Sequence, residues 1–164
     1  MANVLEPDFD ATTDRPGFEY RAVKIARQAG SERLGATLYE LPPGESISPY
    51  HAHLANEELA IVLAGRPSLR TAAGWRELET GEAVGFPVGV EFAHQIANFG
   101  TEPARVLMIS EMNAPEVAVY PDSGKVMTRE QPPGTPATGY RKLFREADEV
   151  DYWDGELPPE PEAG

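Results

Sequence analysis

Three histidines and one glutamate form the pattern with the clearest chemical meaning in this sequence. The histidines are His51, His53 and His94, and the chain contains no others. His51 and His53 are two residues apart, so on an extended segment both imidazoles point to the same side. Glu58 begins an apolar run, where an unpaired carboxylate would be costly to bury. Three neutral imidazoles and one carboxylate are a donor set suited to a first-row divalent metal ion.

Two alternatives to this interpretation are open at the level of the residues. His51 and His53 could lie on a surface loop after Pro49 and bind nothing. Glu57 could replace Glu58 as the carboxylate, although on a strand it would face the opposite side. The donor set does not select one metal, and iron, manganese, nickel, copper, cobalt and zinc are all chemically plausible.

Short apolar runs between turns predict the elements that position these residues. Sixteen prolines and fifteen glycines interrupt the sequence, and no segment has the apolar spacing of a long amphipathic helix. We predict strands at 21–28, 34–41, 58–63, 68–71, 75–78, 83–86, 94–98 and 105–112. Many short strands separated by turns indicate an all-β barrel or a two-sheet jelly roll.

The residues around the histidines complete two motifs that resemble those of the cupin superfamily. The matching positions are Gly44, His51, His53, Glu58 and Gly65 in the first motif, and Gly81, Pro87, Gly89, His94 and Asn98 in the second. The spacing before His51 is one residue longer than in the family pattern, and that before His94 is two residues longer. Both extra lengths fall in turns. The resemblance covers residues 33–111.

The resemblance implies a double-stranded β-helix barrel with a metal ion inside it. His51, His53, Glu58 and His94 would be the metal ligands, and Asn98 would support the strand after the last ligand. Four further residues could line the substrate pocket, namely Arg33, Tyr39, Met108 and Ser110. The resemblance also implies a homodimer, since proteins of this family commonly dimerise.

Charge divides the chain into three parts. Lys and Arg number 14 against 27 Asp and Glu, and most of the acidic excess lies near the two ends. We predict an irregular N-terminal arm at 1–19, the cupin barrel at 20–129, and at 130–164 a Pro-rich linker, a further strand over 141–145 and an acidic extension. Tyr152 and Trp153 in this extension are expected to dock against the same barrel or a second subunit.

Composition excludes several classes of function. An acidic chain without a basic stripe is a poor ligand for nucleic acid or for an anionic membrane surface. The absence of cysteine excludes thiolate chemistry. The first residues lack the apolar stretch of a signal peptide, so a cytoplasmic location is expected.

The favoured function is that of a metal-dependent enzyme acting on a small organic molecule, with dioxygenase-like oxidation as the leading reaction. A cupin isomerase or decarboxylase is one alternative. Another is a non-catalytic module that senses a metal or a small ligand.

Overall fold

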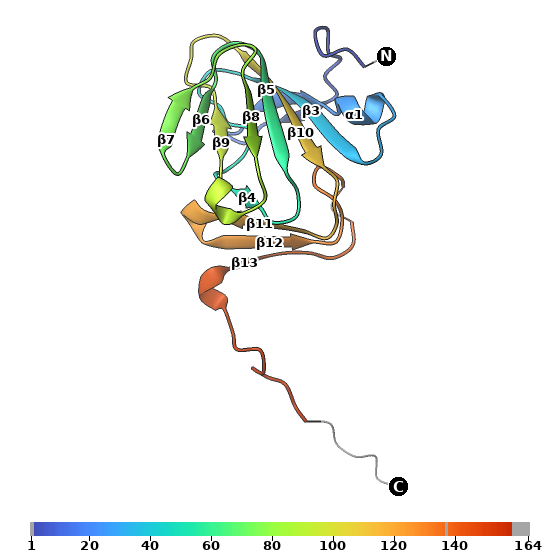
Figure 1. The fold of residues 1–164 in the computed structure, drawn as a ribbon, viewed down its shortest axis with the longest axis vertical. Helices are drawn as coiled ribbons and strands as arrows, with labels where there is room; N and C mark the ends of the chain where they lie inside the picture. The colour runs from blue at the N-terminus through green and yellow to red at the C-terminus, as the bar shows by residue number, and fades with distance from the viewer. Residues whose placement is uncertain (1, 137, 159–164) are drawn as a thin grey trace.

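The computed structural model describes residues 2–136 and 138–158, and most of its regular structure is antiparallel β-sheet (Figure 1). The largest sheet has six strands in the order β1 (Ala11–Thr13), β2 (Tyr20–Val23), β3 (Leu34–Leu41), β10 (Ala104–Glu111), β5 (Glu58–Ala64) and β8 (Ala83–Phe86). A three-stranded sheet has the order β7 (Gly74–Glu77), β6 (Ser68–Thr71) and β9 (Gln95–Ala97). The all-β barrel expected from the sequence is confirmed.

A third sheet lies beneath these two in the view of Figure 1. Its strand order is β13 (Arg141–Arg145), β12 (Lys125–Arg129), β11 (Glu116–Tyr120) and β4 (Ala52–His53). Strand β4 immediately follows His51, so this sheet contributes directly to the histidine cluster. Strands β4, β11 and β12 were not predicted from the sequence.

Apolar side chains from the first two sheets form the main core. The cluster contains Leu41, Ala60, Val62, Leu69, Leu78, Phe86, Ile96 and Val106. The register of β10 against β3 and β5 places Val106 opposite both Tyr39 and Val62. Because alternate residues of a strand face opposite sides, this register also decides which side chains face the interior.

Gly65 shows why a glycine is required at the end of β5. Its φ is +77°, and a Cβ placed there would lie 2.8 Å from the Cα of Ala104 and 2.9 Å from the carbonyl oxygen of Pro103. Any larger residue would be strained and would also displace the start of β10.

Two expected elements differ from the structure. The strand expected at 21–28 ends at Val23 and is followed by the one-turn helix α1 (Ile25–Gln28). Alanine favours helix, Ala26 is buried, and Gly30 at φ +85° follows the turn. The N-terminal arm is also not wholly irregular, because β1 pairs with β2.

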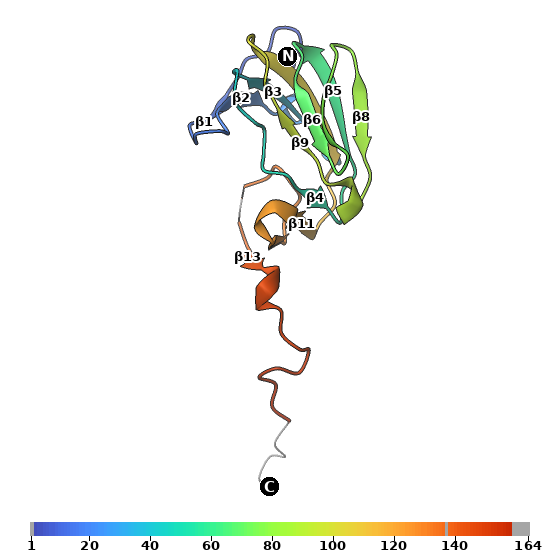
Figure 2. The ribbon, with the colours of Figure 1, turned by 90° about the vertical axis from the view of Figure 1, so that its left-hand side faces the viewer.

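The remaining regular elements are short. Single 3₁₀ turns lie at Val90–Phe92, Pro121–Ser123 and Glu146–Asp148. None of the helices within the described ranges has the length and hydropathy needed to cross a membrane. Figure 2 shows the segment after β13 running away from the sheets.

Candidate metal centre

Backbone pairing brings the histidines of the two motifs together. His51 and His94 form an isolated antiparallel bridge. The N–H of His51 donates to the carbonyl oxygen of His94 at 3.1 Å, and the N–H of His94 donates to that of His51 at 2.8 Å. His53 follows on β4, and Glu58 is the first residue of β5. Segments that are distant in the sequence therefore meet at this cluster.

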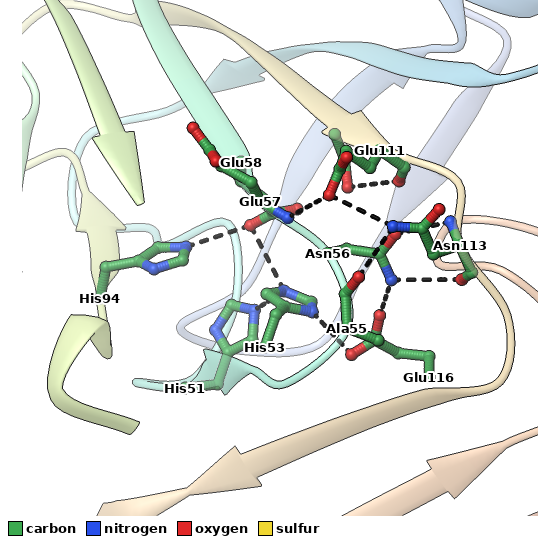
Figure 3. A network of polar contacts seen from close by, with 11 residues as sticks. His51, His53, Ala55, Asn56, Glu57, Glu58, His94, Glu111, Asn113 and Glu116 are labelled. Atoms are coloured by element: carbon green, nitrogen blue, oxygen red, sulfur yellow. Dashed lines mark hydrogen bonds and ion pairs between the residues drawn. The ribbon is translucent and has the colours of Figure 1, made fainter. Parts of the chain in front are cut away.

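The donor atoms of His51, His53 and Glu58 lie together, and Nε2 of His94 faces the same carboxylate without joining that group (Figure 3). Nε2 of His53 lies 3.0 Å from Nε2 of His51 and 3.3 Å from Oε2 of Glu58. Nε2 of His94 lies 3.2 Å from the same oxygen. Donor atoms of His51, His53 and Glu58 all lie within 4.8 Å of one another. This spacing is that of atoms able to share one small cation.

The opposite ring nitrogens determine the tautomers of these histidines. Nδ1 of His51 lies 2.9 Å from the carbonyl oxygen of Pro49, and Nδ1 of His94 lies 3.2 Å from that of Phe92. A carbonyl oxygen accepts hydrogen bonds and cannot donate, so we assign the proton of each neutral ring to Nδ1. The Nε2 lone pairs are then free to bind a metal, an arrangement typical of metal-ligating histidines.

Packing holds two of the rings in place. The ring of Phe86 stacks on His94 with centroids 3.7 Å apart, and Tyr120 stacks on His51 at 5.9 Å. Both aromatic residues lie at the ends of strands, in β8 and β11. The imidazoles are thus oriented by packing as well as by hydrogen bonds.

Charge within the cluster favours a cation at its centre. Burial opposes ionisation of Glu58, but the neighbouring His53 and His94 rings outweigh it and hold the pKa of Glu58 well below its usual range. Burial alone would lower the pKa of His53, yet its hydrogen bonds to Glu116 and Glu58 raise the pKa to about 9. Burial and the neighbouring His53 and His94 lower the pKa of His51 to about 4. The raised pKa of His53 and the lowered pKa of Glu58 both reflect a site in which positive charge beside the carboxylate is favoured.

The residues fit a divalent metal ion. Nε2 of His94 is buried and makes no well-directed hydrogen bond, although Oε2 of Glu58 lies 3.2 Å away. Buried polar atoms are nearly always satisfied, so an orphaned imidazole nitrogen aimed at a carboxylate indicates a missing electrophile. Imidazole and carboxylate ligands suit iron, manganese, nickel, copper, cobalt and zinc.

Glu116 and Asn56 form a second layer behind His53 that was not predicted from the sequence. Oε1 of Glu116 lies 3.3 Å from Nδ1 of His53, and its other oxygen accepts a hydrogen bond from the amide of Asn56. Oδ1 of Asn56 accepts from the N–H of Asn113 at 2.6 Å. Glu116 and Asn56 are fully buried. Their signal in the sequence is weak, because Glu116 is 63 residues from the histidine that it contacts.

A cavity of about 260 Å³ opens above the histidines. Besides the cluster itself, its lining consists of Tyr20, Tyr39, Ile47, Ser48, Ile96, Met108, Pro133 and Gly134. The four side chains expected to line the pocket separate into two pairs. Tyr39 and Met108 line the cavity, whereas Ser110 lines a shallow groove beside Glu57 and Glu58, and Arg33 lies exposed on the turn before β3.

Pro133 and Gly134 belong to the segment expected to be a linker, and they reach the cavity. Lys24 donates a hydrogen bond to the carbonyl oxygen of Gly134, and Arg129 donates to that of Thr135 at 3.0 Å. These contacts hold the segment against the mouth of the site.

Comparisons with known proteins identify relatives of this fold. Residues 37–110 match the family described as the cupin domain. A solved structure of a candidate sugar phosphate isomerase from Acidithiobacillus ferrooxidans is 29% identical with a TM-score of 0.74, covering 83% of this chain and 82% of that one. A sugar phosphate isomerase from a cupin superfamily, from Silicibacter pomeroyi, is 24% identical with a TM-score of 0.71, covering 82% of each chain, and shows the shared fold.

A third structure is less similar. The polyketide cyclase RemF from Streptomyces resistomycificus is 27% identical with a TM-score of 0.55, covering 66% of this chain and 78% of that one. No curated protein matches the chain.

Proposed function

The chain is a member of the cupin superfamily, and on that premise we propose that it is a metal-dependent isomerase of small hydroxy-carbonyl compounds with an anionic end, such as sugar phosphates. The observation that carries the proposal is the grouping of donor atoms from His51, His53 and Glu58 beside a small cavity, with Nε2 of His94 3.2 Å from the same carboxylate. The similarity to a candidate sugar phosphate isomerase, over four fifths of both chains, supports this substrate class.

His51, His53, Glu58 and His94 would hold the metal ion. A divalent ion held by these residues would supply polarisation of a carbonyl oxygen, which would make the neighbouring carbon more acidic, as aldose–ketose interconversion needs. The cavity of about 260 Å³ limits the reacting end of the substrate to a small group.

Tyr39 is the cavity residue best suited to donate a hydrogen bond to the substrate. Burial is the largest cause that raises the pKa of its hydroxyl, and the neighbouring Tyr20 and Glu58 raise it further. The phenol therefore remains protonated at neutral pH. A protonated hydroxyl beside Glu58 can donate to a substrate oxygen that gains charge during the reaction.

Lys24 gives the anionic end of the substrate a place to bind. A neighbouring cavity of about 270 Å³ shares Tyr20, Tyr39 and Gly134 with the metal cavity and is lined by Lys24, Thr12 and Thr37. A ligand that spans both cavities would have its oxygens at the histidine cluster and its phosphate near the Lys24 ammonium.

Dioxygenase-like oxidation is the second candidate function. It is favoured by the apolar side of the cavity, where Ile47, Ile96 and Met108 would shield reactive species from water. The same four donors suit a redox-active ion such as iron or manganese. A bidentate enol or catechol-like compound would be its substrate.

The test is an NMR assay of metal-loaded protein in D₂O with a panel of aldose and ketose phosphates. We expect interconversion with incorporation of solvent deuterium at the carbon next to the carbonyl. His94→Ala should reduce the rate by about 100-fold or more, because metal polarisation contributes several kcal/mol to the transition state. Lys24→Met should raise KM for phosphorylated substrates more than KM for their unphosphorylated forms, because it removes the charge near the phosphate as well as the hydrogen bond to Gly134.

An oxygen electrode distinguishes the alternatives. Oxygen uptake with enediols or catechols, without isomerisation, would replace the isomerase with the dioxygenase. Tight ligand binding without turnover in either assay would make the protein a binding module and contradict both catalytic proposals.

A further inference from the structure

The C-terminal arm, which comprises residues 146–158, exposes large apolar side chains. Tyr152 is 82% exposed and Trp153 is 71% exposed, and the two rings contact one another edge to face at 4.7 Å. Val150 and Leu157 are exposed as well. The arm runs away from the body of the protein (Figure 2). Exposed aromatic residues on an extended arm are typical of a segment that packs against a partner.

The arm is also strongly acidic. Its acidic residues are Glu146, Asp148, Glu149, Asp151, Asp154 and Glu156, and the sequence of the arm contains no basic residue. Among the described residues, none of these carboxylates lies within 4.0 Å of a basic side chain. Within the described part of a single chain, the arm therefore has apolar side chains that are exposed and carboxylates that form no ion pair.

Strand β13, which precedes the arm, has the complementary properties. It is the edge strand of its sheet, and all five of its residues are exposed. Arg141, Lys142 and Arg145 are basic, and within the described ranges no carboxylate lies within 4.0 Å of them. Leu143 and Phe144 between them are 44% and 46% exposed.

Like charges also face one another across this edge. The register of β12 and β13 pairs Lys125 with Arg145 and Arg129 with Arg141. Like charges directly opposite on neighbouring strands are destabilising, so an anionic segment along this edge would relieve repulsion. A hollow of about 450 Å³ lies beside the edge and offers space for an aromatic ring. It is lined by Val126, Phe144 and Arg145 and, from the start of the chain's own arm, by Glu146, Asp148, Glu149 and Val150.

We propose that the acidic arm of one copy of this chain docks along β13 of a second copy, and that the two copies exchange arms reciprocally. Residues 149–157 would pair with the free edge of β13, as extended segments commonly add to an exposed strand. The acidic side chains would meet Arg141, Lys142 and Arg145, and Tyr152 or Trp153 would fill the hollow. Because each copy offers both an arm and a basic edge, the exchange closes as a two-fold dimer.

Sedimentation analysis of the full chain at several protein concentrations tests the proposal. We expect a dimer for the wild type and a monomer for a chain that ends at Val150, which lacks Tyr152 and Trp153 but keeps the lining of the hollow. The double variant Tyr152→Ala/Trp153→Ala should weaken the dimer on the order of 30-fold, as expected for an aromatic hot spot. Arg141→Glu/Lys142→Glu should weaken it too, whereas Arg27→Glu, a matched exposed cation on α1, should not.

Mixing two defective variants gives the sharpest readout. The chain that ends at Val150 retains the basic edge and the whole lining of the hollow, and the Arg141→Glu/Lys142→Glu chain retains an arm. Each should be monomeric alone, and the mixture should form a one-armed heterodimer. Circular dichroism checks that every variant is folded.

Two results would overturn the proposal. One is a wild type that is monomeric at every concentration; in a Trp75→Phe background, fluorescence of a buried indole at Trp153 would then show that the arm packs on its own chain. The other is a dimer that survives removal of the arm.

Discussion

His53 and Glu116 come from neighbouring strands, β4 and β11, and Nδ1 of the histidine lies 3.3 Å from Oε1 of the glutamate. The glutamate is fully buried and is also held by the amide of Asn56. The four-stranded sheet therefore has a direct role in the candidate metal site. It supplies the carboxylate that orients one of the candidate metal ligands.

Glu116→Gln should lower the affinity for a divalent metal ion by about 10- to 100-fold. The amide removes the negative charge that strengthens the basicity of His53, and partners of this kind contribute that much to metal affinity. Isothermal titration of the chelator-treated protein measures the effect.

Glu57→Gln is the matched control for this substitution. Glu57 precedes Glu58 but is exposed, and it does not line the metal cavity. Its variant should bind metal like the wild type. Equal affinity in the Glu116 and Glu57 variants would show that Glu116 has no role in orienting His53.

Asn98→Ala should destabilise the fold by about 2–4 kcal/mol. The Asn98 amide donates to the carbonyl oxygens of Leu41 and Glu102 at 2.9 and 2.8 Å, and its oxygen accepts from the N–H of Gly100. The substitution leaves these groups without partners, which costs roughly 1–3 kcal/mol each before relaxation.

Chemical denaturation measures this loss. Asn3→Ala, an exposed position near the N-terminus, should change the free energy of unfolding by less than about 0.5 kcal/mol. A loss below about 1 kcal/mol for Asn98→Ala would mean that water replaces the missing amide and that its three hydrogen bonds do not stabilise the fold.

Glu40→Gln should lower stability at neutral pH but not in acid. Glu40 on β3 bonds to Arg21 on β2 and to Arg105 on β10, the latter at 2.8 Å. Burial opposes ionisation, but these hydrogen bonds lower the pKa of Glu40. Its stabilisation is therefore present above the ordinary glutamate pKa and is lost as the pH falls through the lowered value.

The expected cost of Glu40→Gln at neutral pH is about 1 kcal/mol. Urea unfolding in neutral and in acidic buffer measures it, with the exposed Glu32→Gln as control. A cost that persists unchanged in acid would indicate a packing role for Glu40 rather than an ionic one.

Tyr39→Phe should reduce kcat of the proposed isomerisation by about 100-fold and leave metal affinity unchanged. Removal of one preorganised donor to a developing negative charge has an effect of this size. Tyr20→Phe is the control, because Tyr20 contacts Tyr39 edge to face at 5.1 Å and lines the same cavity. Equal losses in both variants would assign the effect to the cavity wall rather than to the Tyr39 hydroxyl.

Local spacing identified three residues, His51, His53 and Glu58, whose donor atoms the structure brings together. His51 and His53 are two residues apart, and Glu58 begins the apolar run that follows, so these positions depend on one short stretch of chain. Strands 34–41, 68–71 and 83–86 were predicted with the bounds that the structure has.

Features that depend on distant pairing were not predictable in the same way. Glu116 reaches His53 through the pairing of β4 with β11, which no short pattern encodes. Helix α1 is a single turn, too short for helical periodicity to appear. Pro133 and Gly134 look like linker residues, and they line the cavity because Lys24 and Arg129 hold their segment in place.

Metal binding at the His51, His53, Glu58 and His94 cluster is the most direct test of the proposed site. The protein is stripped with a chelator, titrated separately with Mn²⁺, Fe²⁺ and Zn²⁺, and assayed by elemental analysis after dialysis. We expect about one ion per chain, a higher melting temperature on loading, and loss of both effects in His94→Ala and Glu58→Gln but not in Glu57→Gln. Binding of no ion, or equal binding by all of these variants, would contradict the assignment of this cluster as a metal site.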